Sequence, residues 1–283
     1  MSVTNASDWC GKVGDGWARE WPRTERSFTD LAPHLTRAIL SVAPDHGLFL
    51  DLGCGVGSTA AEVANARPAA SVLGVDLSEP MIAIARERYR LSNLRFVAGD
   101  VLEVGRQEPA PALIFSRHGV MFFADPATAF ADLRRDVSPG APLVFSCFGS
   151  RRDNVWAAEL DEAIGVTPPP PRGYAPGPFA FGDPAYVSEM MARAGWRVAT
   201  ATPIAFSYVA GEGRNDAAAI ADAIGFFGRI GPAAAAIRSV GGEQRAALFD
   251  RIGMRLARYA RSGCVAMPAS AWIWTAHAEG KPA

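Results

Sequence analysis

The chain has 283 residues, of which 49% are hydrophobic and 20% are charged, and its formal net charge is −1. This length can hold one large domain or two small ones, and the apolar content is sufficient for a substantial core. The near-neutral charge gives no general attraction to nucleic acid or to an anionic membrane surface.

The cysteines and the apolar runs exclude further classes of protein. Cys10, Cys54, Cys147 and Cys264 stand far apart, without a C-x-x-C pair or a cluster with histidine, so neither a disulfide framework nor a metal site is predicted. The first thirty residues carry charged residues and glycines throughout, which is not the pattern of a signal peptide. The sequence contains no run of about 18 or more apolar residues, so no membrane span is predicted. We therefore expect a cytoplasmic enzyme without a metal.

Residues 48–59 read L-F-L-D-L-G-C-G-V-G-S-T, a short apolar run followed by a glycine-rich turn and then by a helical pattern. Gly53, Gly55 and Gly57 stand at alternate positions after Asp51. Glycine adopts backbone angles closed to other residues and lets a ligand approach the main chain. The following helix directs free N–H groups and a partial positive charge toward the turn. This order of strand, turn and helix predicts a site for a carboxylate or a phosphate.

The spacing of the glycines separates two classes of nucleotide cofactor. Dinucleotide-binding turns follow G-x-G-x-x-G, with an acidic residue about 20 positions further on. Here Ser58 stands where the third glycine of that pattern belongs, and Gly57 comes one residue earlier. A nicotinamide-dependent oxidoreductase is therefore the less favoured class. For this motif taken alone, a tight turn without any ligand is the simplest alternative.

Two further predicted strands also bring an acid to their ends. The segment 70–76 ends at Asp76, and the segment 94–101 carries Asp100 at its tip. In nucleotide-binding α/β sheets, a carboxylate at the end of the second strand accepts hydrogen bonds from ribose hydroxyls. Together with Asp51, these residues would meet at one edge of a parallel sheet. Solvated loop charge is a poor explanation for three such carboxylates.

The pattern D-x-G-x-G-x-G from Asp51 resembles motif I of the class I S-adenosylmethionine (SAM)-dependent methyltransferases. The resemblance implies that Asp51 lies beneath the amino group of SAM, that Asp76 binds its ribose, and that Asp100 lies against its adenine. S-adenosylhomocysteine would be the product. The expected cofactor-binding residues are Asp51, Gly53, Cys54, Gly55, Gly57, Asp76, Leu77, Met81, Asp100, Val101, Ser116 and Trp17.

The segment before the first strand is rich in tryptophan. Trp9, Trp17 and Trp21 lie close together, and apolar residues recur at helical spacing over 31–40. One interpretation is a helix over the sheet edge, and the other is a lid whose aromatic face lies near the sulfonium of SAM. The stretch W-C-G-K-V-G-D-G-W resembles the opening of a large bacterial group of small-molecule methyltransferases, whose motif I is like that of ubiquinone and menaquinone methyltransferases. This resemblance favours the lid.

Strand and helix patterns alternate as far as residue 148, which predicts a parallel sheet with right-handed crossovers. The segments 112–116 and 142–148 are predicted to be strands four and five, and 127–137 the helix between them. A sixth strand is predicted over 196–208 and a final antiparallel strand over 269–278. The resemblance implies an α/β fold with a Rossmann-like, seven-stranded class I methyltransferase sheet.

Two insertions are expected to interrupt this alternation. Residues 150–182 are rich in proline and aromatic side chains and are predicted to be irregular, and a helix capped by Asp183 follows them. Glycine pairs and prolines divide residues 213–262 into three helical patterns. The expected regions are a helical lid (1–46), a SAM-binding core (47–149), a Pro-rich cap insertion with a helix and strand six (150–212), a helical insertion (213–264), and a return strand with tail (265–283).

The loop after strand four, Ser116-Arg117-His118-Gly119, carries the candidate acceptor residues. It lacks the N-P-P-Y-like box typical of methyltransferases that act on amide or exocyclic amine nitrogens, which argues against methylation of nucleic-acid bases. The ordinary basicity of His118 suits a general base or a group that orients the acceptor. A polar residue that lines the loop is an equal alternative. Arg117 would bind an acceptor carboxylate or tie the loop.

Aromatic side chains near this edge favour an apolar acceptor, although core packing alone also accounts for them. The expected substrate-binding residues are Arg117, His118, Phe122, Phe148 and Tyr174. We expect a SAM-dependent methyltransferase that modifies O, N, S or C of a small, partly hydrophobic acceptor. It would act as a monomer or homodimer, without a nucleic-acid or membrane partner. The alternatives are a non-catalytic SAM-binding sensor or scaffold, and the oxidoreductase.

Overall fold

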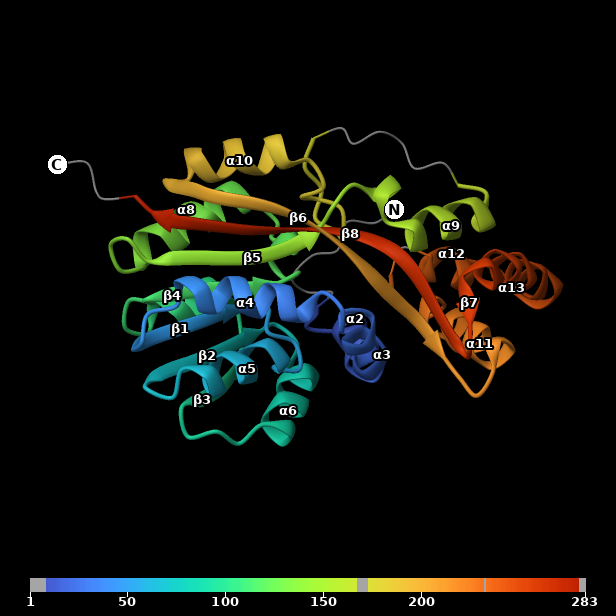
Figure 1. Ribbon diagram of the computed structural model, residues 1–283, viewed down its shortest axis with the longest axis horizontal. Helices are drawn as coiled ribbons and strands as arrows, with labels where there is room; N and C mark the ends of the chain where they lie inside the picture. Colours follow the sequence, from blue (N-terminus) through green and yellow to red (C-terminus); the bar gives the residue numbers. More distant parts are fainter. Residues whose placement is uncertain (1–8, 167–172, 232, 280–283) are drawn as a thin grey trace.

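The computed structural model describes residues 9–166, 173–231 and 233–279. Its centre is an eight-stranded sheet in the order β3-β2-β1-β4-β5-β8-β6, with β7 paired to β8 (Figure 1). Strands β1 to β5 are parallel, and β8 runs antiparallel between β5 and β6. The strands are β1 Gly47–Leu52, β2 Ala70–Asp76, β3 Leu94–Ala98, β4 Leu113–Arg117, β5 Pro142–Phe148, β6 Trp196–Glu212, β7 Ala260–Arg261 and β8 Cys264–Ala278.

The sheet confirms the predicted α/β class and the antiparallel last strand, and the short β7 accounts for eight strands where seven were expected. Helices cover both faces of the sheet, as the alternating pattern requires (Figure 1). On one face lie α4 Ala32–Val42, α5 Ser58–Ala66 and α6 Glu79–Arg88, and on the other α7 Val101–Arg106, α8 Pro126–Asp136 and α10 Pro184–Arg193.

Local capping explains where two of these helices begin. Asp125 accepts a hydrogen bond from the Thr128 N–H at 3.1 Å, and a proline follows it in the first turn of α8. Asp183 accepts from the Ala185 N–H at 2.9 Å and is likewise followed by a proline at the start of α10. Both helices begin within one residue of their predicted starts.

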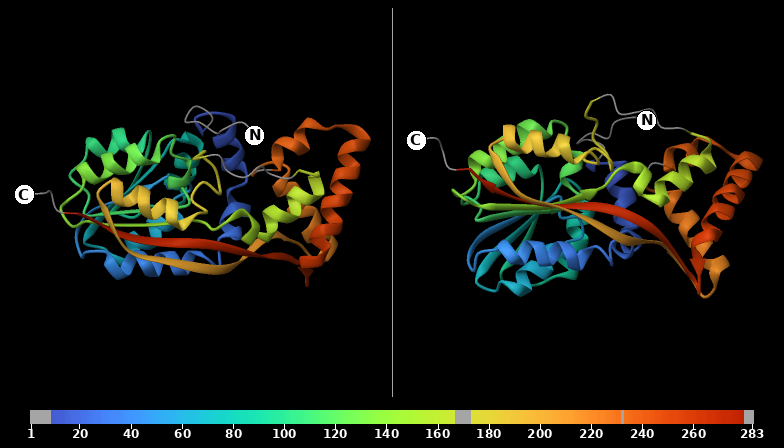
Figure 2. Two further views of the ribbon diagram at one scale, coloured as in Figure 1. Left: turned by 90° about the horizontal axis from the view of Figure 1, so that it is seen from above. Right: turned by 45° about the horizontal axis from the view of Figure 1, so that its top comes forward.

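Strands β6 and β8 run past their predicted ends and leave the sheet as a two-stranded ribbon (Figure 2). The predictions stopped at residue 208 in β6 and began at residue 269 in β8. The additional residues pair with each other, from Val209 opposite Ala266 to Glu212 opposite Cys264. A register shift between Val209 and Gly211 lies within this part, and a bulge of this kind increases the local bend and twist.

Helices pack on this ribbon and form the second half of the molecule (Figure 2). The three helical patterns predicted over 213–262 are confirmed as α11 Asp216–Phe227, α12 Ala234–Ser239 and α13 Gly242–Leu256, followed by the short helix η3 Ala257–Tyr259. The expectation that residues 150–182 are irregular was wrong in part, because η2 Arg151–Asp153 and α9 Val155–Ile164 lie there. The proline run 167–171 lies outside the described residues.

Asn154 explains the unexpected helix α9. Its side-chain amide donates to the Ser150 carbonyl at 2.9 Å and to the Ser270 carbonyl at 3.2 Å, and its Oδ1 accepts from the Ser270 N–H. This fully buried side chain therefore holds the start of α9 against β8. The contact joins residues 116 positions apart, so no local pattern indicates it.

Two N-terminal helices, α2 Lys12–Arg19 and α3 Trp21–Ser27, lie at the ends of the parallel strands, between the sheet and the helical insertion (Figure 1). Helix α2 packs on α6, and α3 packs on β6. The first contact is close, because a Cβ placed on Gly14 would lie 2.7 Å from the Ser78 hydroxyl oxygen. Within the described parts of the chain, no helix is long and apolar enough to cross a membrane.

Candidate functional site

The glycine turn after β1 forms a surface of bare backbone. Gly53, Gly55 and Gly57 have φ angles of 65°, 56° and 81°, which other residues rarely adopt. A Cβ on Gly53 would lie 3.2 Å from the Gly119 Cα, so the end of β1 and the loop after β4 approach closely. The Ser116 hydroxyl donates to the Leu52 carbonyl at 2.7 Å and holds these two ends together.

Asp76 organises the same turn from the tip of β2. Its two carboxylate oxygens accept hydrogen bonds from the N–H groups of Gly55 and Ser78, each at 2.9 Å. Burial raises the pKa of Asp76, and these two N–H groups oppose the rise. Asp76, the residue predicted to bind the ribose, therefore lies beside the glycine turn with its carboxylate in a fixed orientation.

Asp51 lies at the end of β1 with 1% of its surface exposed. Within the described residues, neither of its carboxylate oxygens has a hydrogen-bond partner. Burial raises the pKa of Asp51 to about 8, against the opposing charge of Arg117. A buried carboxyl group without a partner is costly, so a ligand that brings a cationic donor would be stabilised here. The α-ammonium group of SAM is such a donor, and Asp51 fits it.

The adenine side of the predicted site is more open. Asp100 is exposed and caps α7, where its Oδ1 accepts from the N–H groups of Leu102 at 2.8 Å and Glu103 at 3.3 Å. Val101 begins that helix. The predicted contacts of Asp100 and Val101 with adenine stay predictions.

Residues of α2 and α6 meet above the glycine turn. Ala18, Val56 and Met81 form a small apolar cluster of their own, against which Trp17 and Trp21 pack. The centre of the Trp9 ring lies 5.8 Å from that of Trp17 and 5.0 Å from that of Phe122, the last residue of the short helix η1 Val120–Phe122. Cys54 is buried beneath the turn, with its Sγ toward Gly74. Leu77, between β2 and α6, is half-buried, and its carbonyl accepts a weak bond from the Cys10 thiol.

Arg117 at the end of β4 is tied to the N-terminal segment. Its guanidinium donates to both carboxylate oxygens of Glu25 on α3 and lies 5.6 Å from the centre of the Phe28 ring. Burial opposes ionisation of Glu25, but Arg117, with Ser58 and Arg88, lowers the pKa of Glu25 below its ordinary value. Of the two predicted roles of Arg117, this conformation shows the structural one, in which Arg117 ties the loop after β4 to Glu25.

His118 has a φ angle of 61°, which is strained for a residue with a side chain. Its backbone N–H donates to the Ser146 carbonyl at 3.1 Å, and its ring Nδ1 lies 2.8 Å from the Ser146 hydroxyl oxygen. The other ring nitrogen, Nε2, is buried and has no partner in the described chain. Burial, assisted by the charge of Arg117, lowers the pKa of His118 to about 3. The ring is therefore neutral but weakly basic, which favours orientation of an acceptor over proton abstraction.

Phe148, at the end of β5, is the centre of an aromatic cluster. Seven ring residues form it: Phe28, His118, Phe148, Trp156, Phe179, Phe206 and Tyr208. Trp156 Nε1 is also buried without a partner among the described residues. Tyr174, predicted to bind substrate, lies apart from this cluster: its ring neighbours are Phe181 and Tyr186, and its hydroxyl donates to the Phe123 carbonyl at 2.5 Å.

Sequence reasoning missed Glu25, Phe28, Ser146 and Trp156 as parts of this site. Phe28 stands in the aromatic N-terminal segment that suggested a lid, which was its one available signal. Ser146 is a polar residue in an otherwise apolar strand, and a polar residue in such a run indicates a specific partner. Trp156 stands in the stretch 150–182, whose aromatic content was its one signal, and Glu25 carries no local signal.

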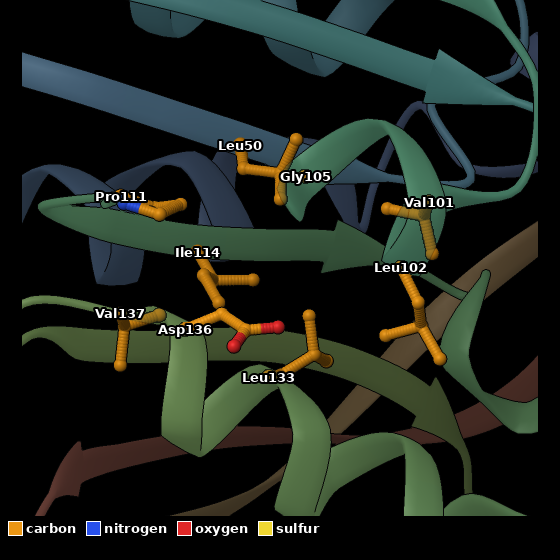
Figure 3. Close-up of a pocket in the computed structure, with 9 residues that line it drawn as sticks. All are labelled: Leu50, Val101, Leu102, Gly105, Pro111, Ile114, Leu133, Asp136 and Val137. Atoms are coloured by element: carbon orange, nitrogen blue, oxygen red, sulfur yellow. The ribbon is translucent and has the colours of Figure 1, made fainter. Parts of the chain in front are cut away.

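The gap between the sheet and helices α7 and α8 is a packing defect (Figure 3). Apolar side chains such as Leu50, Ile114 and Leu133 surround it and leave a cavity of about 10 Å³. That volume holds at most about one water molecule, so no cofactor binds there. Metal ligands are also not gathered anywhere in the described ranges, since no group of three suitable side chains lies together.

Comparison with known proteins agrees with this geometry. Residues 49–140 match the family described as "Methyltransferase domain". Over this segment the chain resembles a methyltransferase domain. The match spans β1 to the turn before β5, which contains the glycine turn and the three carboxylate tips.

Two curated relatives resemble the chain over this domain. Trans-aconitate 2-methyltransferase of Variovorax paradoxus is 34% identical over 137 residues, which is 47% of this chain and 52% of that protein. Demethylmenaquinone methyltransferase of Thermus thermophilus is 32% identical over 153 residues, which is 53% of this chain and 57% of that protein. The chain thus spans about half the length of the curated relatives that it matches.

A solved structure extends the likeness of the methyltransferase fold over the whole chain. Phosphoethanolamine N-methyltransferase 2 of Haemonchus contortus, in complex with S-adenosyl-L-methionine, superposes with a TM-score of 0.56 and 16% identity. The match covers 99% of this chain and 61% of that protein. At this level of identity, the similarity describes the fold alone.

Proposed function

We propose that this chain is a SAM-dependent methyltransferase that modifies a small, partly hydrophobic acceptor at O, N, S or C. The observation that carries the proposal is the unpartnered, buried carboxyl group of Asp51 beside the bare glycine turn. The methyltransferase domain match over 49–140 supports it. The relatives that are named for trans-aconitate and demethylmenaquinone support an acceptor of small size.

Each cofactor residue has a defined task in this proposal. When bound, SAM supplies a methyl group on a positively charged sulfur. Asp51 accepts hydrogen bonds from the amino group, and Asp76 accepts them from the ribose. The glycine turn lets the ligand approach the main chain, with Ser116 fixing the β4 loop beneath it. Asp100, Val101, Leu77 and Met81 surround the adenine, and Cys54 supports the turn from below.

The acceptor lies on the other side of the turn in this proposal. Trp17 and Phe122 cover the cofactor together with Trp9, and Phe148 with His118 borders the acceptor. His118 is neutral and donates or accepts one hydrogen bond through Nε2, while Ser146 fixes the orientation of its ring. The exclusion of water from this cluster strengthens any such polar contact. The described part of the predicted lid, residues 9–46, then covers the site, and 47–149 form the cofactor-binding core.

Thermal unfolding with candidate ligands tests the proposal. SAM, S-adenosylhomocysteine, NAD and NADP are each added; a ligand at 100 times its Kd stabilises the folded chain by about 2.7 kcal/mol. We expect stabilisation by SAM and S-adenosylhomocysteine, and its loss in Asp76→Ala, whereas exposed Asp45→Asn serves as the matched control. Stabilisation by the dinucleotides alone would remove the methyltransferase assignment. Binding of SAM without methyl transfer to any member of a broad acceptor panel would favour the sensor or scaffold.

A further inference from the structure

Helix α3 and Phe28, the residue that follows it, place a carboxylate and an aromatic ring side by side over the end of β4. Glu25 and Phe28 are three residues apart and therefore lie on one face of the helical segment. Glu25 pairs with Arg117, and the Phe28 ring lies 4.7 Å from His118, 5.7 Å from Phe148 and 6.3 Å from Tyr208. Together, these two side chains have the chemistry of an aromatic carboxylic acid.

Arg117 has one ion-pair partner within the described residues. Within the described residues, Glu25 is the one carboxylate that pairs with Arg117, whose side chain is 12% exposed. The guanidinium also contacts Phe28 of the same N-terminal segment. Without Glu25, this largely buried cation would lie next to His118, whose Nε2 has no partner, and Asp51 would be the nearby carboxyl group on which its charge acts. Such a group is strongly disfavoured unless an anion pairs with it.

Helix α3 is also held on the helical insertion by ion pairs. Arg23 and Arg26 both pair with Asp222 on α11, and Arg23 also pairs with Glu20. The arginine side chains in these pairs are 26% and 17% exposed. These pairs hold α3 beside α11 without Glu25 or Phe28, so a ligand can replace these two side chains while α3 stays on the helical insertion.

We propose that the acceptor is a small carboxylic acid with an apolar, planar body. Its carboxylate binds Arg117, and its body replaces the Phe28 ring against His118, Phe148 and Tyr208. Helix α3 then fills this place when no acceptor is bound. The inference rests on the proposed methyltransferase function and adds the class of acceptor to it.

Benzoate and its neutral counterpart benzamide are suitable probes, because they share a ring and differ in charge. Their Kd values are measured by calorimetry on the full chain saturated with S-adenosylhomocysteine. We expect benzoate to bind at least about 10-fold more tightly than benzamide, since hydrogen bonds between charged partners are the stronger ones. Equal binding of the two probes, or binding of neither, would overturn the proposal.

Variants at both ends of the ion pair sharpen this test. Arg117→Gln should abolish the preference for benzoate, and the double variant Arg117→Gln with Glu25→Gln should do the same without leaving a buried charge unpaired. Glu25→Gln alone should tighten benzoate binding by about 3-fold or more, because the internal competitor is weakened. Exposed Arg193→Gln is the control and should change nothing.

The outcomes also separate this inference from the proposed function. Failure to bind S-adenosylhomocysteine in the wild type contradicts the methyltransferase assignment itself. Normal S-adenosylhomocysteine binding, with a benzoate preference that persists in the Arg117→Gln variants or with weaker benzoate binding in Glu25→Gln, overturns only the carboxylic-acid acceptor.

Discussion

The two halves of the candidate site are held together by different kinds of contact. On the cofactor side, the Asp76 carboxylate accepts hydrogen bonds from the backbone N–H groups of Gly55 and Ser78. Glycines there let the end of β1 and the loop after β4 approach closely. On the acceptor side, Arg117 pairs with Glu25 and Phe148 packs with rings from distant segments. Backbone contacts tolerate few substitutions, whereas paired side chains can be exchanged. The acceptor side is therefore the part in which specificity can change without loss of the cofactor site.

The largest expected effect tests whether the sheet, which carries both sides of the site, and the helical insertion unfold as one unit. Phe145 is fully buried in β5 between Phe130, Phe181 and Trp274. Phe145→Ala should lower the free energy of unfolding by about 3–5 kcal/mol, because a large cavity remains. Urea unfolding followed by hydrogen exchange should show earlier opening in α13 as well as in the sheet. An α13 that keeps its wild-type protection would show that the insertion unfolds separately.

The next effect concerns the charge state of the cofactor side. Because the pKa of Asp51 is raised to about 8 in the folded chain, the folded state binds more protons than the unfolded state between about pH 4 and pH 8. Without ligand, the free energy of unfolding should therefore fall with rising pH in this window, by up to about 1.4 kcal/mol per pH unit. Asp51→Asn should flatten the slope. A wild-type stability that rises from pH 5 to pH 8, with no change of slope in the variant, would contradict this.

A smaller effect tests the contact between the N-terminal helices and the insertion. Asp222 is shared by Arg23 and Arg26, so Asp222→Asn removes both ion pairs at once. We expect a loss of about 1 kcal/mol, as befits partly exposed pairs, and faster hydrogen exchange in residues 12–27. Glu189→Gln, which removes an exposed pair on α10, is the control. Unchanged exchange in α2 and α3 would show that ring contacts alone hold this segment.

The same contrast explains how much could be predicted from the sequence. Strand positions, the glycine turn and the caps of α8 and α10 depend on neighbours in the chain, so residue patterns indicate them. The pairing of Glu25 with Arg117 joins residues 92 positions apart, and that of Asn154 with Ser270 joins residues 116 apart. Neither residue type nor spacing signals such contacts. The structure was therefore needed to locate helix α9 and to show that Phe28 packs in the aromatic cluster.

The smallest effect is an expected absence of change at His118. Its pKa of about 3 keeps the ring neutral over the physiological range. Its NMR signals should stay constant between pH 5 and pH 8, and the pH profile of turnover should show no ionisation from this residue. Ser146→Ala should alter the ring environment without restoring ordinary titration, because burial persists. A His118 signal that titrates near pH 6.5 would reinstate the general-base role.

The ribbon formed by β6 and β8 sets the distance between the sheet and the helical insertion. Each strand residue spans about 3.4 Å, and successive side chains point to opposite faces. Deleting one residue from each arm would turn every later side chain over, whereas deleting two from each would draw the insertion in by about 7 Å with its sidedness intact. A change in the reach of this ribbon that keeps its buried face buried therefore requires an even number of residues to be added to or removed from each strand.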